Sequence, residues 1–126
     1  MNQATEPTEP ISFAIPELKE GEIYAGAIIN PDGTGHHIIL LDGDNDYADW
    51  QSQMDWAKSI GGDLPDRVEQ SMLYKHLPEH FQKDYYWSNT QRGSGSAWDQ
   101  HFSYGYQDWD DSSLKCRARA VRRSPL

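Results

Sequence analysis

Apolar and polar positions follow two different periods along the chain, and these periods separate predicted strands from predicted helices. Residues 22–41 hold two β-branched, apolar runs on either side of a turn at 30–35, where Pro and Gly favour reversal of the backbone. They predict an antiparallel hairpin. The aromatic runs at 84–90 and 97–104, together with the alternating run at 114–122, predict three strands of one antiparallel sheet.

Two segments between the hairpin and this sheet have apolar residues at helical spacing. In residues 47–60 they recur every three or four positions, and Asp46 precedes the segment as the expected helix cap. Residues 67–77 repeat the pattern behind a capping box of Asp66 and Glu69. The chain is therefore predicted to be α+β, with an N-terminal β-hairpin and two helices packed on an antiparallel sheet.

Length and composition restrict the domain organisation. At 126 residues the chain is expected to form one domain, in which an aromatic content of 12% offsets a hydrophobic fraction of only 37%. Residues 1–20 are rich in Pro and Glu and predict a flexible acidic arm, so the folded domain is expected to span 21–126. There is no run long enough for a transmembrane segment and no pattern of a signal peptide, and we expect no membrane partner.

The charge is negative and unevenly distributed. The formal net charge is −9, all 20 acidic residues lie at or before Asp111, and five of the 11 basic residues follow it. An acidic body repels polyanions, so we expect no direct contact with nucleic acid. The same charge could attract a basic partner.

Candidate metal ligands do not have the spacing that known metal motifs require. The acidic loop at 42–46 resembles the start of a calcium loop, but Tyr47 stands where Gly is needed and Gln53 where Glu is needed. His76 and His80 are four residues apart, with a proline between them that separates their faces. We therefore expect no metal and no cofactor.

Catalytic motifs are also missing from the sequence. It contains neither a nucleophile elbow nor a phosphate-binding glycine loop. The single cysteine, Cys116, falls inside a predicted strand, where a thiol is normally an inert core group, and it cannot form an internal disulfide. The expectation is a protein without catalytic residues, not an enzyme.

Five segments occur together in an order that resembles a known family. They are residues 22–26 (EIYAG), 62–70 (GDLPDRVEQ), 86–91 (YWSNTQ), 97–98 (AW) and 117–123 (RARAVRR). Together they are similar to the small phage and prophage proteins of the DUF1566 family, which is related to the C-terminal domain of the Legionella collagen-like adhesin. The resemblance implies a C-type-lectin-like fold with a twisted sheet. It also implies a protein located in the host bacterial cytoplasm or the virion, and it supplies no catalytic motif.

These observations favour a non-catalytic binding module of phage or prophage origin that recognises a protein or a carbohydrate through loops at the C-terminal end of the sheet. Tyr and Trp give a large, rigid contact area at low entropic cost. The candidate ligand-binding residues combine such rings with charged groups: Arg92, Tyr104, Tyr106, Asp108, Trp109, Asp110 and Asp111. Trp87 and Trp98, in contrast, are expected in the core, against the small side chains of the last strand.

A second interpretation follows from the acidity. The protein could be an intracellular phage inhibitor that blocks a basic site, such as a nucleic-acid-binding surface, on a host protein. Its acidic surface would then be formed by Asp42, Asp44, Asp46, Asp49 and Asp55. Both interpretations leave a homo-oligomer open.

Overall fold

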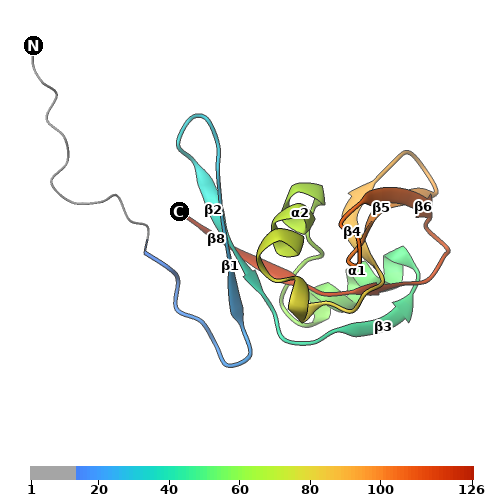
Figure 1. Ribbon diagram of the computed structural model, residues 1–126, viewed down its shortest axis with the longest axis horizontal. Coiled ribbons are helices and arrows are strands. Elements are labelled where there is room, and N and C mark those ends of the chain that lie inside the picture. The colour runs from blue at the N-terminus through green and yellow to red at the C-terminus, as the bar shows by residue number, and fades with distance from the viewer. Residues whose placement is uncertain (1–13) are drawn as a thin grey trace, which may run out of the picture.

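The C-terminal end of the chain passes through both sheets of the fold. In the computed structural model, which describes residues 14–126, β7 (Cys116–Ala118) belongs to a five-stranded sheet and β8 (Val121–Pro125) to a three-stranded one. Figure 1 shows the two strands as one red path across the molecule. The predicted single strand at 114–122 is therefore wrong. The chain changes sheets at residues 119–120, where the Leu41 amide donates to the Ala120 carbonyl at 2.9 Å.

The three-stranded sheet has the order β1-β2-β8. β1 (Ile23–Ile29) and β2 (Gly35–Leu40) pair antiparallel, which confirms the predicted hairpin. The register shifts at Gly26, whose φ of 138° disfavours other residues. A Cβ placed there would lie 3.0 Å from the Met72 sulfur, so this glycine also lets a helix approach the hairpin closely.

The five-stranded sheet has the order β3-β7-β4-β5-β6. Its other strands are β3 (Asn45–Ala48), β4 (Tyr85–Gln91), β5 (Ser96–His101) and β6 (Gln107–Asp111). All neighbours are antiparallel except β4 and β7, which are parallel. The α+β class is confirmed, whereas the expectation of one purely antiparallel sheet is wrong. β6 also corrects the expectation of a loop at 104–111.

The two helices are α1 (Trp50–Ser59) and α2 (Arg67–His76), and a 3-10 turn, η1 (Pro78–His80), follows α2. The capping box of Asp66 and Glu69 is confirmed. The cap of α1 is Asp49, which accepts from the Ser52 amide at 2.8 Å, and not Asp46. Asp46 instead accepts from Nη2 of Arg117 at 3.2 Å, because β3 occupies the residues expected to begin the helix.

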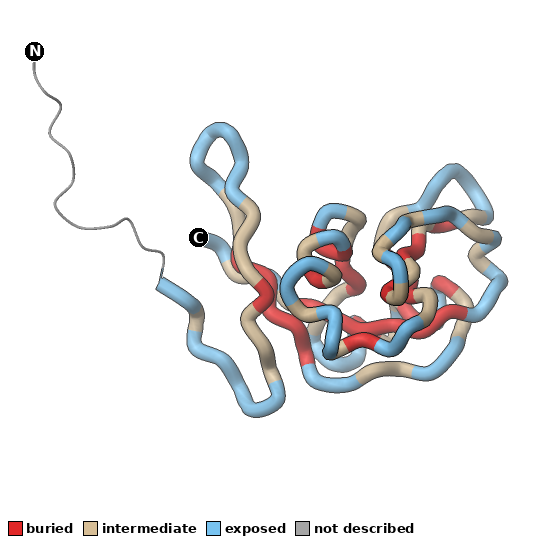
Figure 2. Tube along the Cα trace, in the orientation of Figure 1, coloured by how far each residue is buried: buried red, intermediate tan, exposed pale blue. Residues whose placement is uncertain are grey.

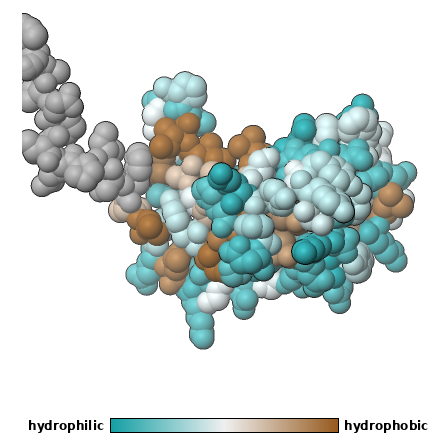
Figure 3. All heavy atoms as spheres, in the orientation of Figure 1, coloured by the Kyte–Doolittle hydropathy of each residue, from teal (hydrophilic) through white to brown (hydrophobic). Residues whose placement is uncertain are grey.

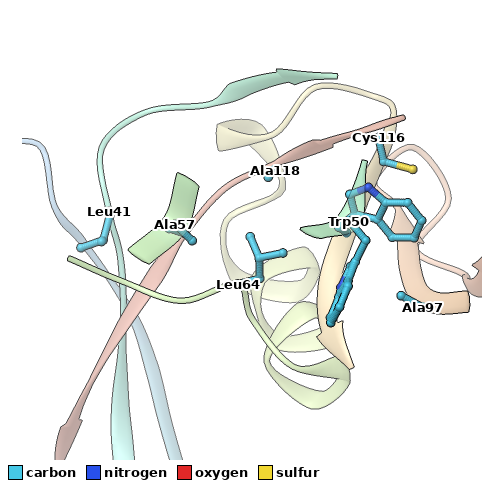
Figure 4. Close-up of a cluster of buried hydrophobic side chains, with 9 residues drawn as sticks. Leu41, Trp50, Ala57, Leu64, Ala97, Cys116 and Ala118 are labelled. Atoms are coloured by element: carbon cyan, nitrogen blue, oxygen red, sulfur yellow. The ribbon is translucent and has the colours of Figure 1, made fainter. Parts of the chain in front are cut away.

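Two apolar clusters form the core, and Figure 2 shows the buried residues concentrated in the central strands. The first joins Trp50 of α1 and Leu64 to the small residues of β7, as Figure 4 shows. Trp87 belongs to it and is fully buried, as expected. Trp98 is only half-buried and lies on the other face of the sheet, so its assignment to the core was wrong.

The basic residues at the C-terminal end neutralise carboxylates of the acidic body. Arg117 binds Asp44 and Asp46, and Arg122 binds Glu22. These contacts attach β7 and β8 to segments more than 70 residues earlier in the chain. Arg123 likewise binds Asp63 and Glu69, so these three arginines are paired within the fold and do not form a separate basic patch.

Residues 14–20 of the predicted arm form no helix or strand and are mostly exposed, and residues 1–13 of that arm lie outside the described residues. On the face that Figure 3 shows, apolar side chains gather over the hairpin, and hydrophilic ones cover most of the opposite end. No helix within residues 14–126 has the length and apolar character needed to span a membrane.

Candidate functional site

β6 is the edge strand of the five-stranded sheet, and it divides the predicted binding residues between two faces. Side chains alternate along a strand, so Asp108 and Asp110 point to one face and Trp109 to the other. Tyr106, which precedes the strand, stacks on His101 on the first side. The predicted site is therefore two surfaces of different chemistry, not one.

The first surface carries exposed rings beside carboxylates, and we term it the aromatic–carboxylate surface: Tyr85, His101, Tyr104, Tyr106, Asp108 and Asp110. The imidazole of His101 lies nearly parallel to Tyr106, with centroids 5.4 Å apart and an interplanar angle of 10°. It lies 5.3 Å from Tyr104, at 23°. Tyr104 is 76% exposed and Tyr106 44%, so both rings present large areas to solvent.

A tight turn between β5 and β6 positions these rings. The His101 amide donates to the Tyr106 carbonyl at 2.9 Å, and the Gly105 amide donates to the His101 carbonyl at 2.7 Å. Gly105 has a φ of 81°, and a Cβ there would lie 2.5 Å from a ring carbon of Tyr74. Only glycine fits this turn without displacing the Tyr74 ring. The turn also sets the separation of Tyr104 and Tyr106, which flank this glycine.

Tyr85 supports the rings from the neighbouring strand. Its hydroxyl is 2.5 Å from that of Tyr106, and its ring meets His101 edge-on at 4.5 Å. The hydrogen bond to Tyr106, with burial and the nearby carboxylates, raises the pKa of Tyr85 to about 12. The Tyr85 hydroxyl therefore stays protonated at neutral pH, and its hydrogen bond holds the aromatic groups before any ligand arrives.

Asp99 is a buried carboxyl group behind this surface that the sequence reasoning missed. It pairs with Asp108 across the β5–β6 ladder and lies beside Asp110. Neither of its oxygens accepts a hydrogen bond from a donor within residues 14–126. Burial, then Asp110 and Asp108, raise its pKa to about 9. Asp99 is therefore protonated at neutral pH and can donate to Asp110.

A signal for Asp99 exists in the sequence. Aspartate is depleted inside strands, and Asp99 stands in the middle of the strand predicted at 97–104. The missing information was the register that places Asp108 and Asp110 next to it.

The second surface is a ladder of alternating cations and rings, which we term the arginine–tryptophan ladder: Arg67, Trp98, Trp109 and Arg92. Trp98 and Trp109 are paired across β5 and β6, with centroids 5.1 Å apart. The guanidinium carbon of Arg67 lies 3.4 Å from the centroid of Trp98, and that of Arg92 lies 3.9 Å from Trp109. Arg67 and Trp98 were not predicted here, since only the three-dimensional register brings them to Trp109.

The remaining predicted residue, Asp111, has a structural role. Its Oδ1 accepts from the amide of Ser113 at 2.8 Å and from its hydroxyl at 2.6 Å, which closes the turn after β6.

The residues of the alternative acidic surface are dispersed and mostly engaged. Asp44 accepts from the Tyr86 hydroxyl and from Arg117, and Asp46 also binds Arg117. Asp49 caps α1, and Asp55 accepts from Gln51 at 3.0 Å. Asp42 is exposed. Four of these five carboxylates therefore already accept internal hydrogen bonds, and two of them share the cation of Arg117.

The part of the chain that the structure describes has no metal-binding cluster, and its single thiol is buried. Within residues 14–126 no set of three or more His, Cys, Asp or Glu side chains is arranged to hold a metal ion. Cys116 is buried, and burial, followed by nearby carboxylates, raises the pKa of its thiol. The thiol is therefore protonated at neutral pH and inaccessible.

Comparison of the sequence with models of protein families gives no match, and comparison with curated proteins gives none either. The resemblance to the DUF1566 family and the C-type-lectin-like assignment therefore stay predictions.

Proposed function

We propose that the protein is a non-catalytic binding module that recognises a carbohydrate through the aromatic–carboxylate surface. The observation that carries this proposal is the nearly parallel, exposed arrangement of Tyr104, His101 and Tyr106 beside Asp108. Its phage or prophage origin, and its location in the host cytoplasm or the virion, rest on the resemblance to the DUF1566 family.

The chemistry of the surface suits a sugar ring. One face of a pyranose presents C–H bonds, whose positive polarity complements the negative face of an aromatic ring. Its hydroxyl groups can donate hydrogen bonds to a carboxylate such as Asp108. Hydrogen bonds to a charged acceptor are stronger than those between neutral groups. Because the Gly105 turn and the Tyr85 hydroxyl already hold the rings, little entropy is lost on binding.

A protein is the other ligand class for this surface. The alternative function is an acidic intracellular phage inhibitor that blocks a basic site on a host protein through a different, acidic surface. This alternative has less support, because Asp44, Asp46 and Asp49 accept internal hydrogen bonds. The two functions differ in their dependence on salt. Exposed charge pairs weaken as ionic strength rises, whereas stacking of neutral rings does not.

The experiment is a glycan microarray probed with the wild-type protein and with Tyr104→Ala. Tyr104 is 76% exposed, so its truncation is expected to leave the fold intact. We expect the wild type to bind a defined group of glycans on the array. The variant is expected not to bind them. Binding to no glycan, with binding to basic proteins that disappears in high salt, would favour the inhibitor.

A further inference from the structure

A cavity lies beside Arg67, on the face of the sheet opposite to the aromatic–carboxylate surface. Its volume is about 420 Å³. Its lining combines hydrogen-bonding groups with one exposed apolar side chain: Asp66, Arg67, Val68, Ser71, Thr90 and Gln107. The size suits a small molecule or one side chain of a larger one.

The guanidinium group of Arg67 is held in place at this cavity. It stacks 3.4 Å above Trp98, and its Nε donates to Oε1 of Gln107 at 3.0 Å. Gln107 is fixed in turn, because its Nε2 donates to the Arg67 carbonyl at 2.7 Å and to Oε1 of the buried Gln100 at 3.0 Å. A guanidinium held this firmly loses little freedom when it binds an acceptor.

The two terminal nitrogens of Arg67 have no acceptor within residues 14–126. Four other arginines differ: Arg117, Arg122 and Arg123 bind carboxylates, and Arg119 donates to carbonyls. Arg92 resembles Arg67, because it also lies over a tryptophan. In a chain with a net charge of −9, Arg67 thus keeps a cation with two free terminal nitrogens at the edge of a cavity, and it forms no ion pair within residues 14–126.

We propose that this cavity binds a small monocarboxylate whose body is apolar or aromatic. The planar fork of the guanidinium matches a carboxylate, and such pairs form two parallel hydrogen bonds. The body would lie against Val68, which is 62% exposed. The Asp66 side chain, which accepts from the Glu69 amide as the cap of α2, lines the same cavity, and a carboxylate there repels a doubly charged phosphate more than a singly charged carboxylate.

This site and the aromatic–carboxylate surface lie on opposite faces of β6, so we expect their ligands to bind independently. Loss of carbohydrate binding would leave carboxylate binding unaffected, and the reverse also holds.

The test is a titration of the full chain with phenylacetate, followed in ¹H–¹⁵N correlation spectra. We expect saturable shifts of the Arg67 Nε–H signal and of the Trp98 indole N–H. Phenylacetamide, which has the same shape without the charge, is expected to cause none. Shifts that map to other residues, or tighter binding of phenyl phosphate than of phenylacetate, would overturn the proposal.

Two arginines provide a matched pair of variants. Arg67→Gln is expected to weaken phenylacetate binding by about tenfold or more, because it removes the charged donors. Arg92→Gln makes the same change in charge, also above a tryptophan, but Arg92 does not line the cavity. It is expected to alter the affinity by less than about twofold. Equal losses in both variants would show only a general charge effect and contradict the site.

A change at Val68 tests the cavity without removing an internal contact of Arg67. Val68→Glu places a carboxylate beside the bound anion and is expected to weaken binding by about tenfold. Val68→Gln, of similar size and without the charge, is expected to retain binding. If Val68→Glu binds phenylacetate like the wild type, the carboxylate does not enter this cavity.

Discussion

Arg123 of β8 holds the buried carboxylate of Glu69 in α2 with two hydrogen bonds of 2.7 Å, from Nε to Oε2 and from Nη2 to Oε1. His36 of β2 adds a third contact at 2.9 Å. The same carboxylate accepts from the Asp66 amide and completes the capping box. Glu69 therefore both starts α2 and attaches it to the three-stranded sheet.

Removal of this arginine is expected to destabilise the fold. Arg123→Leu leaves the Glu69 carboxylate buried without its main partner, which we expect to lower the free energy of unfolding by about 2–4 kcal/mol, since Arg123 is itself partly solvated. Chemical denaturation measures the loss. The double variant Glu69→Gln/Arg123→Leu is expected to recover part of it. A single variant with wild-type stability would contradict this role.

The lowered pKa of Glu69 predicts how the stability of the fold changes as the pH falls. Burial raises its pKa, but hydrogen bonds from Arg123, the Asp66 amide and His36 outweigh burial, and the net shift is downward. The folded pKa lies below the unfolded one, so the stabilisation is present above the unfolded pKa of about 4.3 and is lost as pH falls through the folded value. Glu69→Gln should therefore show a shallower loss of stability in acid. An unchanged acid transition would disagree with this.

Asp99 is expected to make the free energy of unfolding depend on pH in the opposite direction to Glu69. Its pKa is raised to about 9, mainly by burial, so the folded protein keeps a proton that the unfolded chain releases near a pH of about 3.9. Stability due to this group falls as pH rises between those values. Asp99→Asn, whose amide can donate to Asp110 at any pH, should raise the free energy of unfolding by about 1–3 kcal/mol at pH 8 and much less at pH 4. Denaturation at both pH values measures the difference, and an equal effect at both would contradict the proton on Asp99.

Two tryptophans on opposite sides of the sheet should differ in their contribution to stability. Trp87 is fully buried, so Trp87→Ala is expected to lower the free energy of unfolding by about 3–5 kcal/mol. Trp98 is half-buried under Arg67, so Trp98→Ala should cost only about 1–2 kcal/mol. Chemical denaturation compares the two. Equal losses would show that both rings lie in the core.

Local patterns predicted the parts of the fold that depend on neighbours in the sequence. The capping box of Asp66 and Glu69 and the hairpin turn are examples, since their partners lie three to six residues apart. The assignment of Trp87 to the core also followed from its surroundings in the predicted strand. The α+β class is the sum of such local signals.

Long-range pairing decided the parts that local patterns could not predict. β6 contains three aspartates, which disfavour a strand, but five paired residues of β5 impose one. Arg117 similarly draws Asp44 and Asp46 into a contact more than 70 residues away, which leaves Asp49 to cap α1. The candidate site followed the same rule. Its residues were found, but their division between two faces depends on the register of β6.

β6 offers a matched pair of variants to test whether the aromatic–carboxylate surface binds a carbohydrate. Tyr106 and Trp109 are each 44% exposed but lie on opposite faces. The measurement is isothermal titration calorimetry of wild type, Tyr106→Ala and Trp109→Ala with a glycan that the wild type binds on the array. We predict that Tyr106→Ala weakens binding by about 1–3 kcal/mol, with little dependence on salt, and that Trp109→Ala binds like the wild type. Equal affinity of Tyr106→Ala and wild type, or a loss confined to Trp109→Ala, would contradict carbohydrate binding at this surface.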